Sequence, residues 1–119
     1  MTMQYQLPKT PFKNEAKFTA WFGKQIKDQW WFWHKISDAS YEQKPFDWIA
    51  TIDWITHCIE IKIWSEKSKT DIFKKLRPNQ KFWLRRVKEN GWSALVVYYN
   101  KLHNKYWVLE FNDELVITI

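Results

Sequence analysis

The first third of the chain carries apolar residues at helical spacing. Between positions 12 and 29 the apolar residues recur every three to four positions, which predicts an amphipathic helix with one face on a core. The stripe consists of Phe12, Ala16, Thr19, Phe22 and Ile26, with Phe18 and Trp21 beside it. Glu15 falls on the same stripe, where an unpaired carboxylate is costly to bury. Glu15 is therefore either a functional residue or an exposed one on a helix that is rotated slightly from the predicted orientation.

Later segments are rich in aromatic and β-branched residues, which is typical of strands. They lie at 30–36, 46–53, 57–64, 92–100, 106–111 and 115–119. The second and third runs are close enough to pair as a hairpin, although no Asn-Gly or Asp-Gly marks the turn. Pro78 at a first-turn position and Gly91 at a C-terminal cap position bound a second helix over 78–90. Polar residues predict loops at 37–46 and 65–76.

The order of these elements is αβββαβ followed by further strands, which predicts the α/β class. A length of 119 residues without repeats or a linker predicts a single domain over residues 1–119. The hydrophobic content of 45% is too high for a disordered chain, and no apolar run approaches the about 18 residues of a membrane span. The chain shows no leader sequence, and its single cysteine, Cys58, cannot form an internal disulfide or a zinc site alone. We therefore expect a soluble intracellular protein.

The net charge of +6 is concentrated in one part of the chain. Residues 62–88 hold ten basic and two acidic side chains, a net of +8, whereas residues 1–61 are neutral and residues 89–119 carry −2. Such a block predicts a surface for an anionic partner such as a nucleic acid. A solvated helix face next to a charged loop gives the same pattern without any partner.

Two carboxylates and a lysine are expected to meet at one end of the predicted hairpin. Asp47 lies at the start of its first strand, while Glu60 and Lys62 share one face of the other because strand side chains alternate. Oxygen ligands of this kind suit a hard cation that keeps several waters, such as Mg²⁺. The same residues also fit a Lys–Glu pair on a solvated face, with Asp47 as a turn residue.

The context of these residues resembles the PD-(D/E)XK nuclease superfamily. Pro45, Phe46 and Asp47 form P-x-D, and apolar-Glu-apolar-Lys follows at 59–62, between an acid-bearing first helix and a basic second helix. The order αβββαβ is also that of the superfamily's core. The resemblance therefore implies a restriction-endonuclease-like fold, with a mixed central β-sheet flanked by helices and extra C-terminal strands.

Within that superfamily the chain is most similar to the Holliday-junction resolvases of archaea and of the bacterial RecU type, and to related phage nucleases. Residues 34–40, leading into 44–47, resemble their serine-containing loop before the metal-binding aspartate. Residues 76–80 resemble the start of their Gln-bearing second helix, and 107–119 resemble their closing strands. The chain departs from the family at Arg77, where Ser or Thr often precedes the proline, and in a hairpin turn without the usual glycine.

The resemblance implies a Mg²⁺-dependent, structure-specific DNA endonuclease that resolves four-way (Holliday) junctions in recombination and repair, with Mn²⁺ able to replace Mg²⁺. Asp47, Glu60 and the backbone carbonyl of Ile61 would bind the metal, with Glu15 as a further ligand, directly or through water. Lys62 would orient the attacking water and stabilise charge in the transition state. A cytoplasmic location, in a prokaryotic cell or a phage-infected host, is expected on the same ground.

The basic block would then bind DNA. Gln80, near the start of the second helix, either positions water or phosphate or simply packs, and Ser37 or Ser40 would contact the scissile phosphate. The expected phosphate contacts come from Lys67, Lys69, Lys74, Lys75, Arg77, Lys81, Arg85 and Arg86. Such contacts position DNA without reading its sequence and make binding depend on salt. Symmetric cuts in two arms of a junction imply a homodimer.

Two other functions stay open at this point. One is a phage-type nuclease of the same fold that acts on flap, single-stranded or non-specific duplex DNA. The other is a non-catalytic module whose aromatic residues stack on unpaired bases. The set of Asp47, Glu60 and Lys62 favours an enzyme over such a module. The chain has no glycine-rich phosphate loop, so no nucleotide cofactor is expected, and nothing in the sequence assigns a role to its 10 tryptophans.

Overall fold

The computed structural model describes residues 3–36, 47–64, 76–111 and 117–118. Within these ranges helix α1 runs over Glu15–Lys27 and helix α3 over Pro78–Glu89. The strands are β1 (Phe32–Lys35), β2 (Trp48–Ile52), β3 (Ile55–Trp64), β4 (Ser93–Asn100), β5 (Lys105–Glu110) and β6 (Ile117–Thr118). The predicted order of elements is confirmed for this part of the chain, and the α/β class with it. The predicted loop at 37–46 lies outside the described residues, and so does the predicted loop at 65–76 except for its last residue, Leu76, which is buried.

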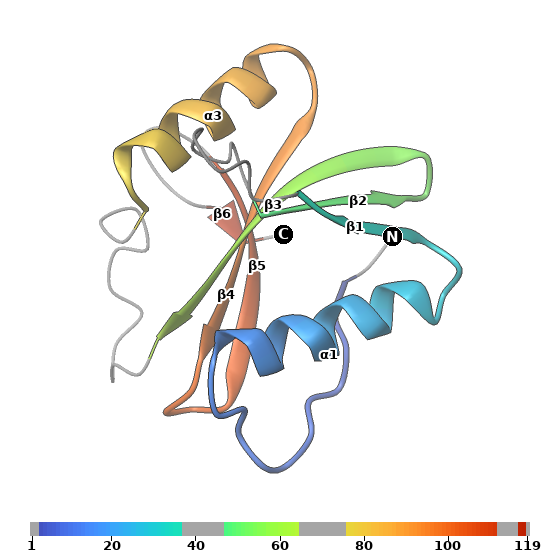
Figure 1. Cartoon of the computed structure of the whole chain (residues 1–119), viewed down its shortest axis with the longest axis vertical. Helices are drawn as coiled ribbons and strands as arrows, with labels where there is room; N and C mark the ends of the chain where they lie inside the picture. Colours follow the sequence, from blue (N-terminus) through green and yellow to red (C-terminus); the bar gives the residue numbers. More distant parts are fainter. Residues whose placement is uncertain (1–2, 37–46, 65–75, 112–116, 119) are drawn as a thin grey trace.

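The strands form a six-stranded mixed sheet in the order β1-β2-β3-β4-β5-β6. β3 and β4 are parallel, because the chain crosses over through α3 between them, and every other neighbouring pair is antiparallel. Figure 1 shows α1 and α3 on opposite sides of the sheet. This arrangement leaves β3 in the interior of the sheet, with one face toward each helix.

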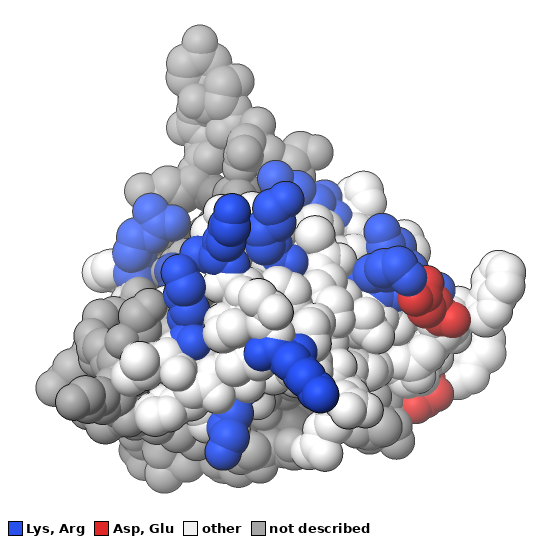
Figure 2. All heavy atoms as spheres, turned by 90° about the horizontal axis from the view of Figure 1, so that it is seen from below, with Lys and Arg blue, Asp and Glu red and all other residues white. Residues whose placement is uncertain are grey.

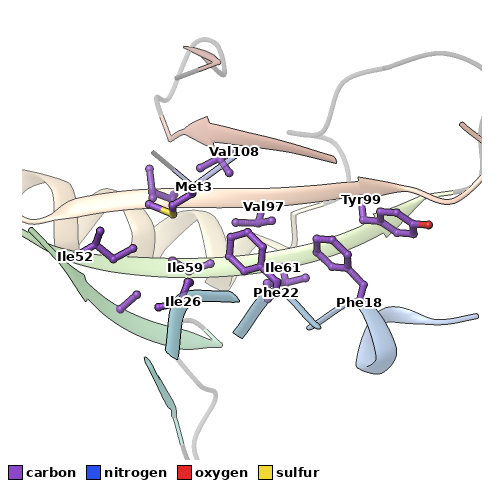
Figure 3. Close-up of a cluster of buried hydrophobic side chains, with 12 residues drawn as sticks. Met3, Phe18, Phe22, Ile26, Ile52, Ile59, Ile61, Val97, Tyr99 and Val108 are labelled. Carbon is purple, nitrogen blue, oxygen red and sulfur yellow. The ribbon is translucent and has the colours of Figure 1, made fainter. Parts of the chain in front are cut away.

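The alternation of side chains along β3 and β4 produces two cores. Toward α1, Phe18, Phe22 and Ile26 pack with Ile59, Ile61, Val97 and Tyr99, as seen in Figure 3. Toward α3, Leu84 packs with Cys58, Val96, Tyr98 and Leu109. The strands at the centre are apolar on both faces because both faces are covered, as is usual around a parallel crossover. Glu60, on the α3 face of β3, is therefore surrounded by protein.

Helix α1 begins later than the sequence predicts. Asn14 is its N-cap, and the Asn14 side chain accepts a hydrogen bond from the Lys17 amide at 2.9 Å. Glu15 is thus the first helical residue and is exposed, so its predicted place on the buried stripe is wrong. The capping asparagine sets the start of the helix, and Phe12 packs on the core from the preceding segment. The buried face consists of Phe18, Thr19, Phe22, Gly23 and Ile26.

The β2–β3 turn reverses direction without glycine. Asp53 and Trp54 have φ values of 50° and 69°, which are the positive values that a tight two-residue hairpin requires at both positions. The turn fixes the register of the hairpin, in which Trp48 lies opposite Ile59. Asp47, one residue before Trp48, is therefore placed beside the Glu60 segment of β3, as the sequence predicts.

Neither described helix is long and apolar enough to cross a membrane.

Candidate active site

Asp47 lies between β1 and β3, just before β2 begins. Its amide donates to the Ile59 carbonyl at 3.2 Å, and its carbonyl accepts from the Ile36 amide at 3.0 Å. Its side-chain Oδ2 accepts a hydrogen bond from the Ile61 amide at 3.4 Å. These bonds on both sides hold the Asp47 carboxylate against the middle of β3. Ile61 itself, whose carbonyl the resemblance assigns to a metal, is 1% exposed.

Glu60 is a buried acid with a defined set of partners. It is only 2% exposed, and its Oε1 accepts a hydrogen bond from Gln80 Nε2 at 2.5 Å. Lys62 Nζ lies 3.7 Å from the same oxygen, and the Lys62 side chain is 19% exposed. Lys62 therefore contacts the buried carboxylate of Glu60 and is itself partly accessible to solvent.

Gln80 connects the start of α3 to Glu60. Its Oε1 accepts from the backbone amide of Arg77 at 2.8 Å, which occupies one of the amides left free before the first turn of a helix. Its Nε2 is then directed to Glu60. Since the Gln80 side chain is buried and engaged at both ends, it positions Glu60 in this structure, whereas the sequence suggested water, phosphate or packing.

The carboxylates act on one another electrostatically. The pKa of Glu60 is raised to about 8; burial is the largest cause, the neighbouring Asp47 charge adds to it, and the Lys62 ammonium opposes it. A hydrogen bond with Asp47 and the charge of Glu15 also raise this pKa. The charges of an acid on α1 and of one just before β2 therefore both disfavour the ionisation of Glu60 in β3. Such a group is stabilised by a shared proton or by a cation.

The donor set fits a hard divalent cation with few protein ligands. Within the described ranges no three His, Cys, Asp or Glu side chains are arranged so that they could hold a metal ion by themselves. Mg²⁺, however, keeps most of its waters and is often bound by one or two carboxylates together with substrate phosphates. Asp47, whose carboxylate is held at the Ile61 amide, and the adjacent Glu60 supply such a pair. Glu15 lines the same groove as Asp47, and its charge acts on Glu60.

A groove of about 720 Å³ opens beside these acids along α1. Glu15 and Asp47 line it together with Trp33, Lys35 and Trp48 on the strand side. The indoles of Trp33 and Trp48 stack with their centroids 4.5 Å apart. This groove was not predicted from the sequence. The alternation of Trp33 and Lys35, which places both on one face of β1, was the signal available for it.

The predicted basic surface is found only in part among the described residues. Arg77, Arg85 and Arg86 of the α3 segment are exposed, and Lys81 is half-buried. Lys67, Lys69, Lys74 and Lys75 lie outside the described residues, as do Ser37 and Ser40. Figure 2, which views the molecule from the α1 side, shows many Lys and Arg side chains and few acids. The exposed lysines of α1 are Lys17, Lys24 and Lys27.

The α1 side is basic although residues 1–61 have no net charge. Glu60 is buried, and Asp47 is half-buried, so these acids of the segment contribute little to the surface. The sequence tally counts buried and exposed charges alike. The positive surface therefore extends beyond the block at 62–88.

Two histidines and the single cysteine of the chain lie on β1 and β3. His57 is buried, with Nδ1 2.7 Å from Ser93 Oγ, and burial lowers its pKa. Cys58 is buried in the α3 core, where burial raises the pKa of its thiol to about 11, as suits a packing residue. His34 is exposed and stacks on Phe32.

The tryptophans fall into distinct environments. Trp21 packs against the α1 core, and Trp107 stacks on Tyr98 with centroids 5.2 Å apart. Trp33 and Trp48 line the groove. Trp30 and Trp54 are 96% and 99% exposed at positive φ.

A scan of this chain against protein-family models finds no match, and a search of curated proteins finds no significant relative.

Proposed function

We propose that this protein is a Mg²⁺-dependent, structure-specific DNA endonuclease with a restriction-endonuclease-like αβββαβ core, as its resemblance to the PD-(D/E)XK nucleases implies. Its proposed substrate is the four-way junction, which is cut by paired phosphodiester hydrolysis. Two symmetric cuts require two active sites, so a twofold dimer is part of the proposal. A phage-type nuclease of the same fold that cuts flap, single-stranded or duplex DNA is the alternative.

The observation that carries this proposal is the contact between Asp47 and Glu60 beside Lys62. The Asp47 charge acts on the buried Glu60, Asp47 Oδ2 accepts from the Ile61 amide at 3.4 Å, and Lys62 Nζ lies 3.7 Å from Glu60 Oε1. Burying acids next to each other opposes folding, because both lose hydration and repel one another when ionised. Packing alone gives no reason for that arrangement, whereas a cation and a phosphate substrate do.

Each residue of the site has a role that follows from its position. Asp47 and Glu60 would hold Mg²⁺, which supplies a polarised water and neutralises charge on the phosphate oxygens. Lys62, with its partly exposed ammonium, orients the attacking water and stabilises the charge that develops on the phosphate. Gln80 holds Glu60 in place through its hydrogen bond. Arg85 and Arg86, exposed on α3, contact DNA phosphates outside the reacting centre.

The proposal is tested by incubating the protein with labelled four-way junction, flap, duplex and single-stranded DNA, in Mg²⁺ and in chelator. We expect Mg²⁺-dependent nicks at symmetric positions of the junction, with little cutting of duplex. Cleavage of flap or single strands in preference to the junction would support the alternative nuclease. Binding without cleavage of any substrate would refute the enzymatic function.

Replacing Lys62 with methionine separates chemistry from binding. We expect the cleavage rate to fall about 10²- to 10³-fold, because a preformed positive charge in a partly buried site is lost. Junction binding in chelator and the urea midpoint should change little, because Met fills most of the same volume. Single-turnover cleavage and fluorescence anisotropy measure these quantities. Lys105→Met, at an exposed position of β5, is the matched control and should cut at the wild-type rate; equal rates for both variants would remove Lys62 from the site.

A further inference from the structure

The groove along α1 has a defined direction. Its helical wall runs from Glu15 to Lys27, a distance of about 18 Å at 1.5 Å per residue. On the strand wall, Lys35 lies opposite Trp48 and therefore next to Asp47, and Trp33 lies two residues farther from that end. The groove thus starts at the proposed metal-binding acids and continues past a basic residue and two indoles to Lys27.

Small residues on α1 keep the groove open. Ala16, Thr19, Ala20 and Gly23 form its helical wall. At Gly23 an added Cβ would lie 2.4 Å from Trp33 Nε1, so only glycine allows the indole to approach the helix this closely. A larger side chain would displace the Trp33 ring from its stack on Trp48. The narrow aromatic part of the groove therefore depends on the absence of a side chain at Gly23.

We propose that this groove holds an unpaired DNA strand that leads away from the scissile phosphate. The inference rests on the proposed function, because it takes the acids at the start of the groove as the reacting centre. Lys35 and Lys27 are exposed at its two ends, and they suit phosphates that follow one another along a strand. The stacked indoles lie between them and offer apolar surface to a base, the combination by which proteins bind single strands without sequence preference.

The dimensions of the groove select a single strand over a duplex. A volume of about 720 Å³ is that of a site for a small molecule or a few linked groups, and it is too small to admit a double helix. A duplex would instead lie across the exposed arginines of α3. The protein would then bind double-stranded arms on its surface and place the unpaired or distorted strand at a branch in the groove. Branched DNA would be preferred because only a branch offers both double-stranded arms for the surface and an unpaired strand for the groove.

Two changes on α1 test the inference without cleavage. Ala20→Leu fills the groove from an exposed helical position with a good helix former, so the fold should persist. Lys27→Ala removes a charge at its far end, and Lys24→Ala is the matched control, because Lys24 is exposed, pairs with Asp28 at 2.7 Å and does not line the groove. Binding is measured in chelator by fluorescence anisotropy, with an oligothymidylate of about ten nucleotides and with a hairpin duplex.

We expect Ala20→Leu to weaken oligothymidylate binding about 10-fold or more, which corresponds to the loss of one stacked base, and to leave duplex binding near the wild-type value. Lys27→Ala should reduce the slope of log affinity against log salt by about 0.7 for the single strand, as expected for one lost phosphate contact. Lys24→Ala should leave that slope unchanged. Equal effects on both DNA forms, or no effect on the single strand, would overturn the inference.

These results are independent of the test for cleavage. If the groove variants lose single-strand binding and the wild-type protein cuts no DNA, the groove assignment stands and the enzymatic proposal fails. If the wild-type protein cuts junctions and the groove variants bind single strands normally, the enzymatic proposal stands and the groove assignment fails. Circular dichroism melts confirm that each variant is folded before binding is compared.

Discussion

Replacing Glu60 with glutamine is expected to abolish Mg²⁺-dependent cleavage and, at the same time, to stabilise the metal-free protein. The cleavage rate should fall at least about 10³-fold, because a ligand for the cation that neutralises phosphate charge is lost. The free energy of unfolding at pH 7 should rise by about 1–3 kcal/mol, because a neutral amide replaces a buried acid beside Asp47. A gain of stability with a loss of activity is typical of a functional residue that opposes folding.

The pH dependence of stability provides a second measurement of the same contact. The folded protein keeps the Glu60 proton up to its pKa of about 8, whereas the unfolded chain releases it near 4.5. In that window unfolding releases a proton, so the stability of the metal-free protein falls as the pH rises from about 4.5 to 8. Glu60→Gln should lack this component and show a flatter profile.

Urea unfolding in chelator over this pH range measures the effect, and Glu110→Gln in β5 is the matched control at a half-exposed position. Excess Mg²⁺ should raise the urea midpoint of the wild-type protein and leave that of Glu60→Gln unchanged, because only a folded-state site stabilises by binding. Wild-type cleavage by Glu60→Gln would remove Glu60 from the proposed centre. Parallel pH profiles for the two proteins would contradict its burial against Asp47.

Replacing Phe18 with alanine is expected to produce the largest loss of stability. Phe18 is fully buried, and its ring stacks on Tyr99 of β4 with centroids 4.7 Å apart and planes 12° apart. It also contacts the rings of Phe22 and Tyr106. Truncation should cost about 3–5 kcal/mol, since the cavity left behind adds to the lost burial of the ring. That is a large part of the 5–15 kcal/mol typical of a domain.

The substitution should also disturb the candidate site, because Phe18 holds the first turns of α1, and with them Glu15, against the sheet. Urea unfolding at pH 7 measures the change in the midpoint. The control is Trp30→Ala, which removes a larger ring from a position that is 96% exposed and should stay within about 0.5 kcal/mol of the wild-type value. Similar costs for the two variants would show that Phe18 does not anchor α1 in solution.

The order of helices and strands was predictable from the sequence because it depends on local spacing. Pro78 begins α3, as expected from the restricted φ of proline, and Gly91 follows that helix at a positive φ of 87°. The alternation of Glu60 and Lys62 along β3 was equally local. The start of α1 was not predicted correctly, because the Asn14 cap outweighed the apolar period that included Phe12. The tight turn at Asp53 and Trp54 lacked its usual glycine and therefore gave no signal for the register.

By itself, then, the sequence determined the α/β class, the order of the elements and which side chains share a face of each strand, because these follow from periodicities of two and 3.6 residues. Only the tertiary structure decided that Gln80 holds Glu60, that Asp47 also lines the α1 groove, and that the α1 side is basic. These features join residues far apart in the chain. Such features depend on which charged side chains are buried. Burial is determined by how the helices pack on the sheet, and a count of residues in the sequence does not reveal it.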